Sequence, residues 1–589
     1  MSDAERNFNA GVHYLRSKQL DAAQRSFTEV LKTAGNHVPT LVNLALIGFA
    51  KGDMNNSEKY LRQAINVDEH NADTNLLLSR VLLAQRRFHE AVRVLDDAGH
   101  INPSLIEVHC NKAAALNEIG DYEAAKESAV LALRLNSRHP DSNLNLANIV
   151  FNMGDYTAAC ESYRRTLGFD PANIGAQLGL GNSLVKLGKY AEALAALDLL
   201  IERNPAVAGA FLARGNAYAD TKRYAEALRD YERVLALHPD LAQAWVSRGT
   251  VLFSLNRDSE ALECFDKALV LDENGADANW NKALLKLARG EYEEGWLLYE
   301  WRWKSKYCLS PVRNFEQPLW LDDADIFGKT ILIHAEQGLG DTIQFSRYLN
   351  LLKDKKCSVI FEVGKPLVSL FRSQHPDLEI LAAGNAIPPF DVHCPLMSLP
   401  LAFKTTLQSI PTMIPYIFAS ESKKNEWTDR LGPKSKRRIG LAWSGNPRFA
   451  GGNDTARPVP LSVLASILRD DIEWHRLQTD LRPADQETLR NQSVIKDHSS
   501  VIADFSDTAA LIGELDLVIS IDTSIAHLAG ALGKPVWVML SFHSDFRWLR
   551  DRSDSPWYPT ARLFRQRSDG DWNDVMARIA EALKGLGGL

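Results

Sequence analysis

The sequence has few cysteines, and their spacing fits neither a metal site nor a disulfide framework. There is no C-x-x-C pair, and no histidine stands at zinc-ligand spacing from a cysteine. This excludes the zinc-finger classes and predicts free thiols in a reducing compartment. The six scattered residues are Cys110, Cys160, Cys264, Cys308, Cys357 and Cys394.

Long apolar runs and an excess of positive charge are also missing. No run approaches the roughly 18 apolar residues that a membrane span needs, and the start, MSDAERNFNA, lacks the basic-then-apolar order of a signal peptide. We therefore expect a cytoplasmic protein without a membrane span. The net charge of -7 gives no overall attraction to nucleic acid, so nucleic acid is not an expected partner. With 589 residues and 45% hydrophobic content, the chain should fold into several domains or a repeat array.

The first half of the chain repeats itself. Gly-Asp-Tyr or a close variant recurs at Gly120, Gly154, Gly188, Lys222 and Gly290, with a period of 34 residues. Prolines close several units, because proline cannot continue a helix. The pattern resembles the tetratricopeptide repeat, in about nine units. We expect an α-solenoid over residues 1–309, since stacked helix pairs make a superhelix with a concave groove.

Asparagines recur on the first helix of these units. They occupy the sixth or the ninth position of the unit, one helical turn apart and on the same face, although asparagine is a mediocre helix former. Such a row can hydrogen-bond an extended peptide's main chain and looks like the asparagine ladder of O-GlcNAc transferase. The alternative is that these side chains cap turns or face water. The acceptor-binding candidates are Asn9, Asn43, Asn111, Asn145, Asn148, Asn182, Asn216 and Asn281.

After the repeats, the pattern changes to strand, turn and helix. Trp296, Trp301 and Trp303 crowd the last unit, which suggests a domain junction rather than a flexible tether. Strand-like runs then alternate with helical ones in two successive blocks, which predicts parallel α/β folding. We expect a Rossmann-like domain over residues 310–425 and a second over 426–589. A terminal amphipathic helix from Trp572 should cross back to the first block. Two facing domains of this kind are the GT-B glycosyltransferase architecture.

An acid occupies the turn in ILIHAEQGLGDTIQ, residues 331–344. A helix start carries partial positive charge and suits phosphate, whereas the carboxylate of Asp341 would repel it. The same carboxylate suits a general base that faces an acceptor hydroxyl. The alternative is a plain helix cap, because aspartate is among the best capping residues. His334 and Glu336 are candidates to orient Asp341 or to replace it, and Gln337 is an acceptor contact or a structural side chain.

A phosphate-ready turn appears later, in DLVISIDTSIAHLAG. Hydroxyls and backbone N–H groups converge where this strand meets its helix, so Thr523 and Ser524 should hold a diphosphate. Asp522 is expected to bond a sugar hydroxyl or to fix the turn. An arginine after the IGLAWSG strand would stabilise a departing diphosphate without a metal. Further donor-site candidates are Ser444, Asn446, Arg448 and Arg457, with Gln478 as a candidate contact to the base.

The order of these motifs carries a wider resemblance. Residues 291–570 look like the catalytic region of bacterial tetratricopeptide-repeat glycosyltransferases. The HAEQGLGD and DTSIAHLAGALGKPVW segments are similar to those of lipopolysaccharide heptosyltransferases. The resemblance implies that Asp341 is the general base and that His527, in the family's D-T-x-x-x-H pattern, contacts a phosphate or the sugar. For a lone histidine, the structural alternative stands beside this role.

Together these features predict a metal-independent, inverting glycosyltransferase. No Asp-x-Asp motif lies at a strand end, so no metal is expected. The donor would be a nucleotide sugar, with a UDP-GlcNAc-like molecule as the first guess, and the acceptor a serine or threonine of a protein held by the repeats. The resemblance suggests flagellin as one such protein. The alternatives are transfer to lipopolysaccharide or another glycan, and a repeat scaffold without activity. The sugar, the base, the acceptor and the oligomeric state are not identified by the sequence.

Overall fold

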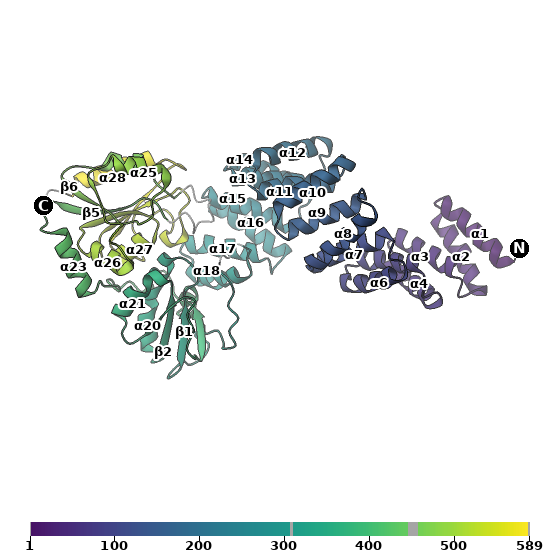
Figure 1. The fold of residues 1–589 in the computed structure, drawn as a ribbon, viewed down its shortest axis with the longest axis horizontal. Coiled ribbons are helices and arrows are strands. Elements are labelled where there is room, and N and C mark those ends of the chain that lie inside the picture. The colour runs from purple at the N-terminus through teal and green to yellow at the C-terminus, as the bar shows by residue number, and fades with distance from the viewer. Residues whose placement is uncertain (1, 307–309, 446–456, 587–589) are drawn as a thin grey trace. The chain divides into compact units, whose positions relative to one another are not determined.

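The computed structural model describes residues 2–306, 310–445 and 457–586, and these residues divide into two compact units, Met1–Asp240 and Leu241–Leu589. The first unit is a stack of helical hairpins (Figure 1). Its helices are α1 (Asp3–Arg16), α2 (Leu20–Thr33), α3 (Val38–Ala50), α4 (Met54–Val67), α5 (Ala72–Ala84), α6 (Phe88–Ile101), α7 (Ile106–Ile119), α8 (Tyr122–Leu135), α9 (Pro140–Asn152), α10 (Tyr156–Phe169), α11 (Ile174–Lys186), α12 (Tyr190–Arg203), α13 (Ala208–Asp220) and α14 (Tyr224–Leu237).

The Gly-Asp-Tyr motif forms the inner turn of the hairpins that carry it. Gly120 ends α7 with a φ of 88°, a left-handed conformation that glycine adopts without steric cost. The side chain of Asp121 then caps α8 by accepting the Ala124 N–H at 3.2 Å. Gly154 and Asp155 repeat this arrangement one unit later. The predicted repeat period is thus the period of the hairpins.

The hairpins continue into the second unit. There they are α15 (Ala242–Ser254) with α16 (Asp258–Leu271), and α17 (Ala276–Ala288) with α18 (Tyr292–Tyr299), followed by the 3-10 helix η1 (Glu300–Lys304). Among residues 2–306 there are therefore eighteen α-helices in nine hairpins, which confirms the predicted solenoid. No helix in the described parts of the chain is both long and apolar enough to cross a bilayer.

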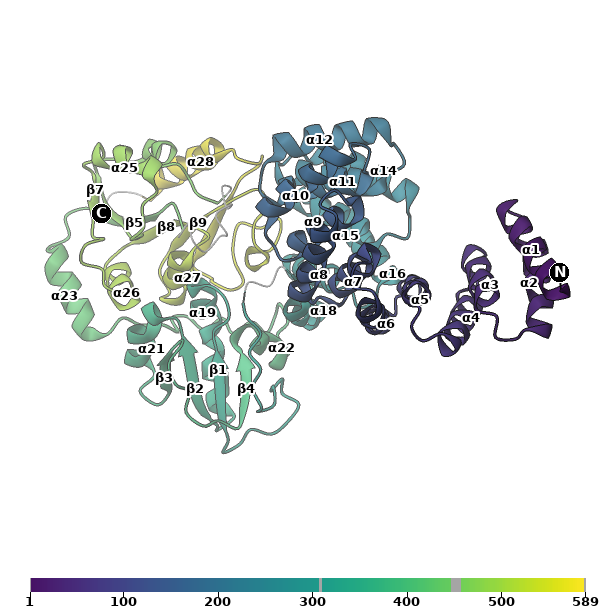
Figure 2. The ribbon, with the colours of Figure 1, turned by 45° about the vertical axis from the view of Figure 1, so that its right-hand side comes forward.

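Two parallel sheets follow the hairpins. The four-stranded lobe (residues 313–402) has the order β3-β2-β1-β4 (Figure 2). Its strands are β1 (Thr330–His334), β2 (Ser358–Val363), β3 (Glu379–Ala382) and β4 (Val392–Pro395). Its helices are α19 (Leu339–Phe345), η2 (Ser346–Tyr348), α20 (Leu349–Asp354), η3 (Lys365–Leu367), α21 (Val368–Gln374), η4 (Leu396–Ser398) and α22 (Leu399–Ala402).

The six-stranded lobe (residues 421–586) has the order β10-β9-β8-β5-β6-β7, again parallel. Its strands are β5 (Arg437–Ala442), β6 (Ile472–Arg476), β7 (Ile495–Asp497), β8 (Leu517–Ile521), β9 (Val536–Leu540) and β10 (Ala561–Arg565). Its helices are α23 (Glu421–Leu431), α24 (Leu461–Leu464), η5 (Ala465–Ile467), α25 (Pro483–Arg490), α26 (Phe505–Gly513), α27 (Ser524–Ala531), η6 (Phe546–Trp548) and α28 (Trp572–Lys584).

Both lobes match the predicted α/β pattern, because buried parallel strands read as continuous apolar runs. β8 and β9, for instance, are buried along their whole length. The terminal helix α28 differs from expectation. Its apolar face, with Trp572, Val575 and Ile579, is buried in the core of the six-stranded lobe. Among the described residues, α28 packs against η5, α24 and β10 of its own lobe rather than crossing to the first lobe as predicted.

The last hairpins join the two lobes through aromatic side chains. Trp296 of α18 contacts Phe345 of the four-stranded lobe and Phe546 of the six-stranded lobe, with ring centroids 6.1 and 5.9 Å apart. Tyr292 accepts a hydrogen bond from the Trp557 Nε1–H at 3.0 Å. The predicted junction is therefore present. It depends on Trp296, Tyr292 and Tyr299 of α18, whereas Trp301 and Trp303 are only partly buried.

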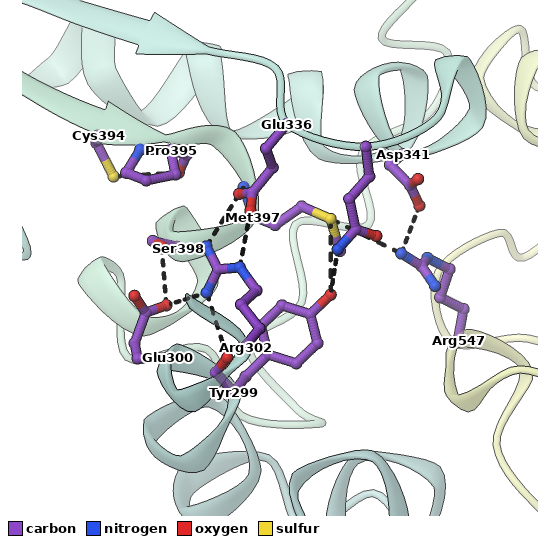
Figure 3. A network of polar contacts seen from close by, with 11 residues as sticks. Tyr299, Glu300, Arg302, Glu336, Asp341, Cys394, Pro395, Met397, Ser398 and Arg547 are labelled. Carbon is purple, nitrogen blue, oxygen red and sulfur yellow. Dashed lines mark hydrogen bonds and ion pairs between the residues drawn. The ribbon is translucent and has the colours of Figure 1, made fainter. Parts of the chain in front are cut away.

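A buried ion pair fixes the same junction (Figure 3). Arg302 of η1 has no exposed side-chain surface and donates two hydrogen bonds to the Glu336 carboxylate, at 2.7 and 3.0 Å. Its Nη1 also donates to Glu300 at 2.7 Å. Burial lowers the pKa of Arg302, but the carboxylates of Glu336 and Glu300 raise it by more than burial lowers it. The guanidinium therefore stays charged.

Removing Arg302 should destabilise the second unit strongly. Arg302→Met leaves the buried Glu336 carboxylate unpaired, which typically costs about 3–5 kcal/mol. Scanning calorimetry should show a lower melting temperature for this variant. Arg62→Met, which breaks a half-exposed pair with Glu58, is the control and should cost less than about 1 kcal/mol. Equal shifts for the two variants would contradict the proposed role of the buried pair.

Candidate functional site

The candidate site begins at the turn between β1 and α19. Gly338 precedes the helix, and Asp341 lies in its first turn. The Asp341 Oδ2 accepts the Gly338 N–H at 2.8 Å, so the carboxylate does stabilise the start of the helix. Its side chain remains 20% exposed. The capping role that the sequence left open is thus observed, and it occupies one of the two carboxylate oxygens.

The other oxygen of Asp341 forms an ion pair with Arg547 of η6, in the six-stranded lobe (Figure 3). Arg547 also donates to Asp545 at 2.7 Å and is 8% exposed. Burial lowers the pKa of Arg547, but the carboxylates of Asp341 and Asp545 outweigh it and hold the pKa above its ordinary value. The acid of one lobe therefore faces a permanent cation of the other.

The start of α27 lies beside this pair. β8 ends before Asp522, Thr523 is the N-cap of α27, and its hydroxyl lies 3.2 Å from the Ser520 hydroxyl. Helix α19 packs directly against α27. A Cβ on Gly340 would lie 2.9 Å from His527 Cδ2 and 3.4 Å from the Ser524 backbone. The glycine next to Asp341 thus lets the two turns approach each other.

His527 is held on several sides. Its Nδ1 lies 3.0 Å from the Tyr558 hydroxyl, its Nε2 lies 3.6 Å from Asp522 Oδ1, and its ring stacks on Trp548. Burial raises the pKa of Asp522, but His527 and the nearby charge of Arg457 lower it by more, so Asp522 remains a carboxylate. The structural role that the sequence left open for His527 is therefore observed.

His334 and Glu336 do not serve Asp341. His334 is 3% exposed and lies against Phe315 and His393, and burial lowers its pKa to about 3. A histidine with this pKa is a weak base at neutral pH. Both carboxylate oxygens of Glu336 accept hydrogen bonds from Arg302, and Oε1 also accepts one from the Met397 N–H at 3.0 Å. Both side chains thus have structural partners, and their catalytic role stays a prediction.

Gln478 also has a structural role. Its Oε1 accepts the backbone N–H groups of Trp443 and Ser444 at 2.7 and 2.9 Å, and its Nε2 donates to Ser444 Oγ and to the Asp480 carbonyl. A glutamine amide offers two lone pairs and two N–H groups. All four are used within the protein, and a contact of Gln478 with a base stays a prediction. The amide fixes the end of β5, with Ser444 buried beside it.

The remaining donor-site candidates are Arg457, Asn446 and Arg448. Arg457 belongs to the described residues and acts electrostatically on Asp522. Asn446 and Arg448 lie outside the described residues. In the parts that the structure describes, the predicted turns around Asp341 and Asp522 come together at the carboxyl ends of β1 and β8.

The asparagines of the repeats fall into three groups. Asn43 and Asn281 donate to carbonyls of their own helices, both at 2.8 Å. Asn148 and Asn216 accept from the hydroxyls of Tyr163 and Tyr231 at 2.7 and 2.9 Å, and Asn145 donates to the Cys110 carbonyl at 3.0 Å. These five amides contribute to the packing of the hairpins. The third group, Asn9, Asn111 and Asn182, takes no part in these contacts. The Asn111 Nδ2 is buried without a hydrogen-bond partner among the described residues.

Arg547 is the site residue that sequence reasoning missed. It stands in SFHSDFRWLRDR, a segment without a glycine-rich turn or a strand, and it meets Asp341 only through folding. Tyr299 was also missed, although it accepts the Gln337 Nε2–H at 3.2 Å and so contacts the acid turn. The aromatic crowding of the last repeat was the available signal for Tyr299.

The family models that match this chain lie on the helical hairpins. Two tetratricopeptide-repeat models match, one at residues 178–242 and 212–276 and the other at 48–114. A model described as anaphase-promoting complex, cyclosome, subunit 3 matches residues 118–199. A tetratricopeptide repeat protein from Parabacteroides merdae is 21% identical, covering 42% of this chain and 98% of that one, with a TM-score of 0.38.

Two curated proteins are also similar. Protein FlbA of Caulobacter vibrioides is 26% identical over 331 residues, which are 51% of this chain and 54% of FlbA. An uncharacterised protein, y4yS, of Sinorhizobium fredii is 33% identical over 94 residues, which are 15% of this chain and 52% of y4yS. The chain thus spans about half the length of the curated relatives it matches. The hairpins and the matching repeat models show that the chain contains tetratricopeptide repeats.

Proposed function

We propose that the chain is a GT-B glycosyltransferase that moves a sugar from a nucleotide-sugar donor to a serine or threonine hydroxyl of a polypeptide acceptor. One observation carries the proposal. The acid of Asp341 lies beside the N-terminus of α27, at the carboxyl ends of strands from two parallel sheets, where open α/β sheets bind ligands.

The chemistry divides between the two turns. The donor diphosphate would bind at the start of α27, where Thr523, Ser524 and the backbone N–H groups favour negative charge. The acceptor hydroxyl would attack the anomeric carbon and give its proton to Asp341. The bond between that carbon and the diphosphate oxygen breaks, and its electron pair leaves with the nucleoside diphosphate. Attack from the face opposite the leaving group inverts the anomeric carbon.

The helical hairpins support a polypeptide as acceptor. In the first unit, α5, α7, α9 and α11 each contact the next first helix of the stack, so these first helices form its inner side. Asn111 and Asn182 lie on them, and Asn111 has a buried donor without a partner in the described part of the chain. An extended peptide main chain offers carbonyls to such donors. Flagellin is one acceptor to test.

Two other functions compete with this proposal. The acceptor can be a glycan, for which the repeats would have no evident use. The chain can also be a binding scaffold without activity, and the engagement of both Asp341 oxygens favours that alternative. An assay of nucleoside diphosphate release from a panel of nucleotide sugars separates these functions, run with flagellin, with lipopolysaccharide and without acceptor. Release from no donor under any condition would leave only the scaffold.

Replacing the proposed base should stop transfer without unfolding the protein. Asp341→Asn keeps the size of the side chain but removes a proton acceptor, so kcat should fall at least about a hundredfold. The matched control is Asp354→Asn, at the exposed end of α20, which should keep full activity. Steady-state kinetics check this, and full activity in Asp341→Asn would remove the base assignment.

Substitutions in the repeats should weaken acceptor binding alone. Asn111→Ala with Asn182→Ala should raise KM for a polypeptide acceptor by roughly fivefold for each hydrogen bond lost. Hydrolysis of the donor in the absence of acceptor should not change. Asn55→Ala, exposed on the second helix of its hairpin, is the control. An unchanged KM in the double variant would argue against a peptide held along these helices.

A further inference from the structure

Arg547 lies at the centre of the candidate site, and the steps above do not use it. It reaches from η6 to Asp341, as Figure 3 shows, and holds Asp545 with its other terminal nitrogen at 2.7 Å. Its Nε is buried and has no hydrogen-bond partner among the described residues. A buried guanidinium N–H without a partner is costly, so this donor indicates an acceptor that is absent from the structure.

The neighbours of Arg547 belong to the proposed diphosphate site. The next residue, Trp548, stacks on His527 of α27 with a centroid distance of 5.4 Å. Asp341, its ion-pair partner, follows Gly340, which approaches Ser524 and His527. The guanidinium therefore lies close both to the proposed base and to the helix start that would receive phosphate.

Other buried arginines of this region are committed to structural partners. Arg302 binds Glu336. Arg347 donates to the Gln344, Pro411 and Trp557 carbonyls at 2.8, 3.1 and 2.8 Å. Arg547 differs because its partner, Asp341, is 20% exposed and is itself a proposed reacting group.

The present contacts of Asp341 restrain it as a base. One oxygen accepts the Gly338 N–H and the other binds Arg547, so a hydroxyl proton would have to compete with a guanidinium. A departing diphosphate, in turn, needs a cation. Carboxylate and phosphate both match the planar fork of an arginine, so one guanidinium can bind either of them.

We propose that Arg547 exchanges Asp341 for the donor diphosphate when the donor binds. This inference rests on the proposed glycosyltransferase function. The exchange frees one Asp341 oxygen to accept the hydroxyl proton, and it places Arg547 where the electron pair of the breaking bond arrives on the diphosphate. Asp545 keeps the guanidinium oriented in both arrangements. The base is thus released only when a donor is present.

The exchange has a consequence for binding that transfer assays do not measure. Asp341 and the diphosphate compete for one guanidinium, so the ion pair reduces the affinity for nucleoside diphosphate. The ligand has to break the ion pair with Asp341 before it can bind, which weakens its apparent affinity. Removing the Asp341 charge should therefore tighten binding. Neutralising Asp341, the proposed base, should therefore tighten nucleotide binding while it abolishes transfer.

Calorimetric titration of the full chain with UDP, and with GDP, CDP and ADP in parallel, tests the exchange. Asp341→Asn should bind the preferred nucleoside diphosphate on the order of tenfold more tightly than the unaltered chain, within the usual range of coupling between linked sites. Arg547→Gln should bind it at least about thirtyfold more weakly. In the Arg547→Gln background, Asp341→Asn should have no further effect. Asp354→Asn is the control for an unrelated change of charge.

The outcomes separate the inference from the proposed function. Equal tightening by Asp341→Asn with and without Arg547 would show general repulsion between the acid and the phosphate, and would overturn the exchange. Unchanged affinity in Asp341→Asn would overturn it as well, while donor-dependent transfer by the unaltered chain would leave the proposed function intact. If no nucleoside diphosphate binds and no donor is turned over, both fail. Should Arg547→Gln lose its fold by circular dichroism, Arg547→Lys replaces it, since it keeps the charge but loses the fork.

Discussion

The buried ion pair between Arg302 and Glu336 is the constraint on which the second unit depends. A guanidinium with no exposed surface has to be matched by a carboxylate, and both have to reach their places for either to be tolerated. Arg302 directly follows the last hairpin, and Glu336 lies in the turn that follows β1. The pair therefore fixes the acid turn to the end of the repeats, and the rings of Tyr292, Trp296 and Tyr299 fill the space around it.

The same junction includes the eighth hairpin. Asn256 donates to the Phe542 carbonyl at 3.1 Å, Arg550 pairs with Asp258 at 3.4 Å, and Phe253 meets His543 edge-on. Phe542, His543 and Arg550 belong to the segment that carries Arg547. The proposed exchange of Arg547 between Asp341 and a diphosphate would therefore occur on a segment that is held by repeats as well as by the sheet.

Much of the fold could be predicted from the sequence, because its signals are local. The 34-residue period predicted the hairpins, and the apolar starts of ILIHAEQGLGDTIQ and DLVISIDTSIAHLAG predicted β1 and β8 close to their observed bounds. Short strands were missed. β7 has three residues, two of them exposed, and β10 contains Arg562 and Arg565. Neither sequence therefore has the continuous apolar run of a buried strand. Helix α23 was missed because its only buried residue is Trp427.

The sequence predicted the candidate site only where the residues of a single turn are enough to indicate a chemical role. Asp341 and Asp522 stand beside glycine or hydroxyl residues at strand ends, and both turns were found. Arg547 was not, because its meaning depends on a partner 206 residues away. Gln478 and Glu336 were assigned functions because polar residues near a strand end look available. Their hydrogen bonds, which no sequence pattern displays, show that they are already used.

The boundary between the compact units, after Asp240, falls inside the repeat array rather than at its end. Seven hairpins precede it, and the two that follow contact the two lobes through the side chains named above. The junction contacts named above all involve residues from Leu241 onward, so a change in the number of the first seven hairpins leaves those contacts in place. Up to Asp240 the array is a series of repeated hairpins, whereas the hairpins after it also contact the two lobes. Chimeras between related proteins are best joined at this residue rather than where the helices give way to strands.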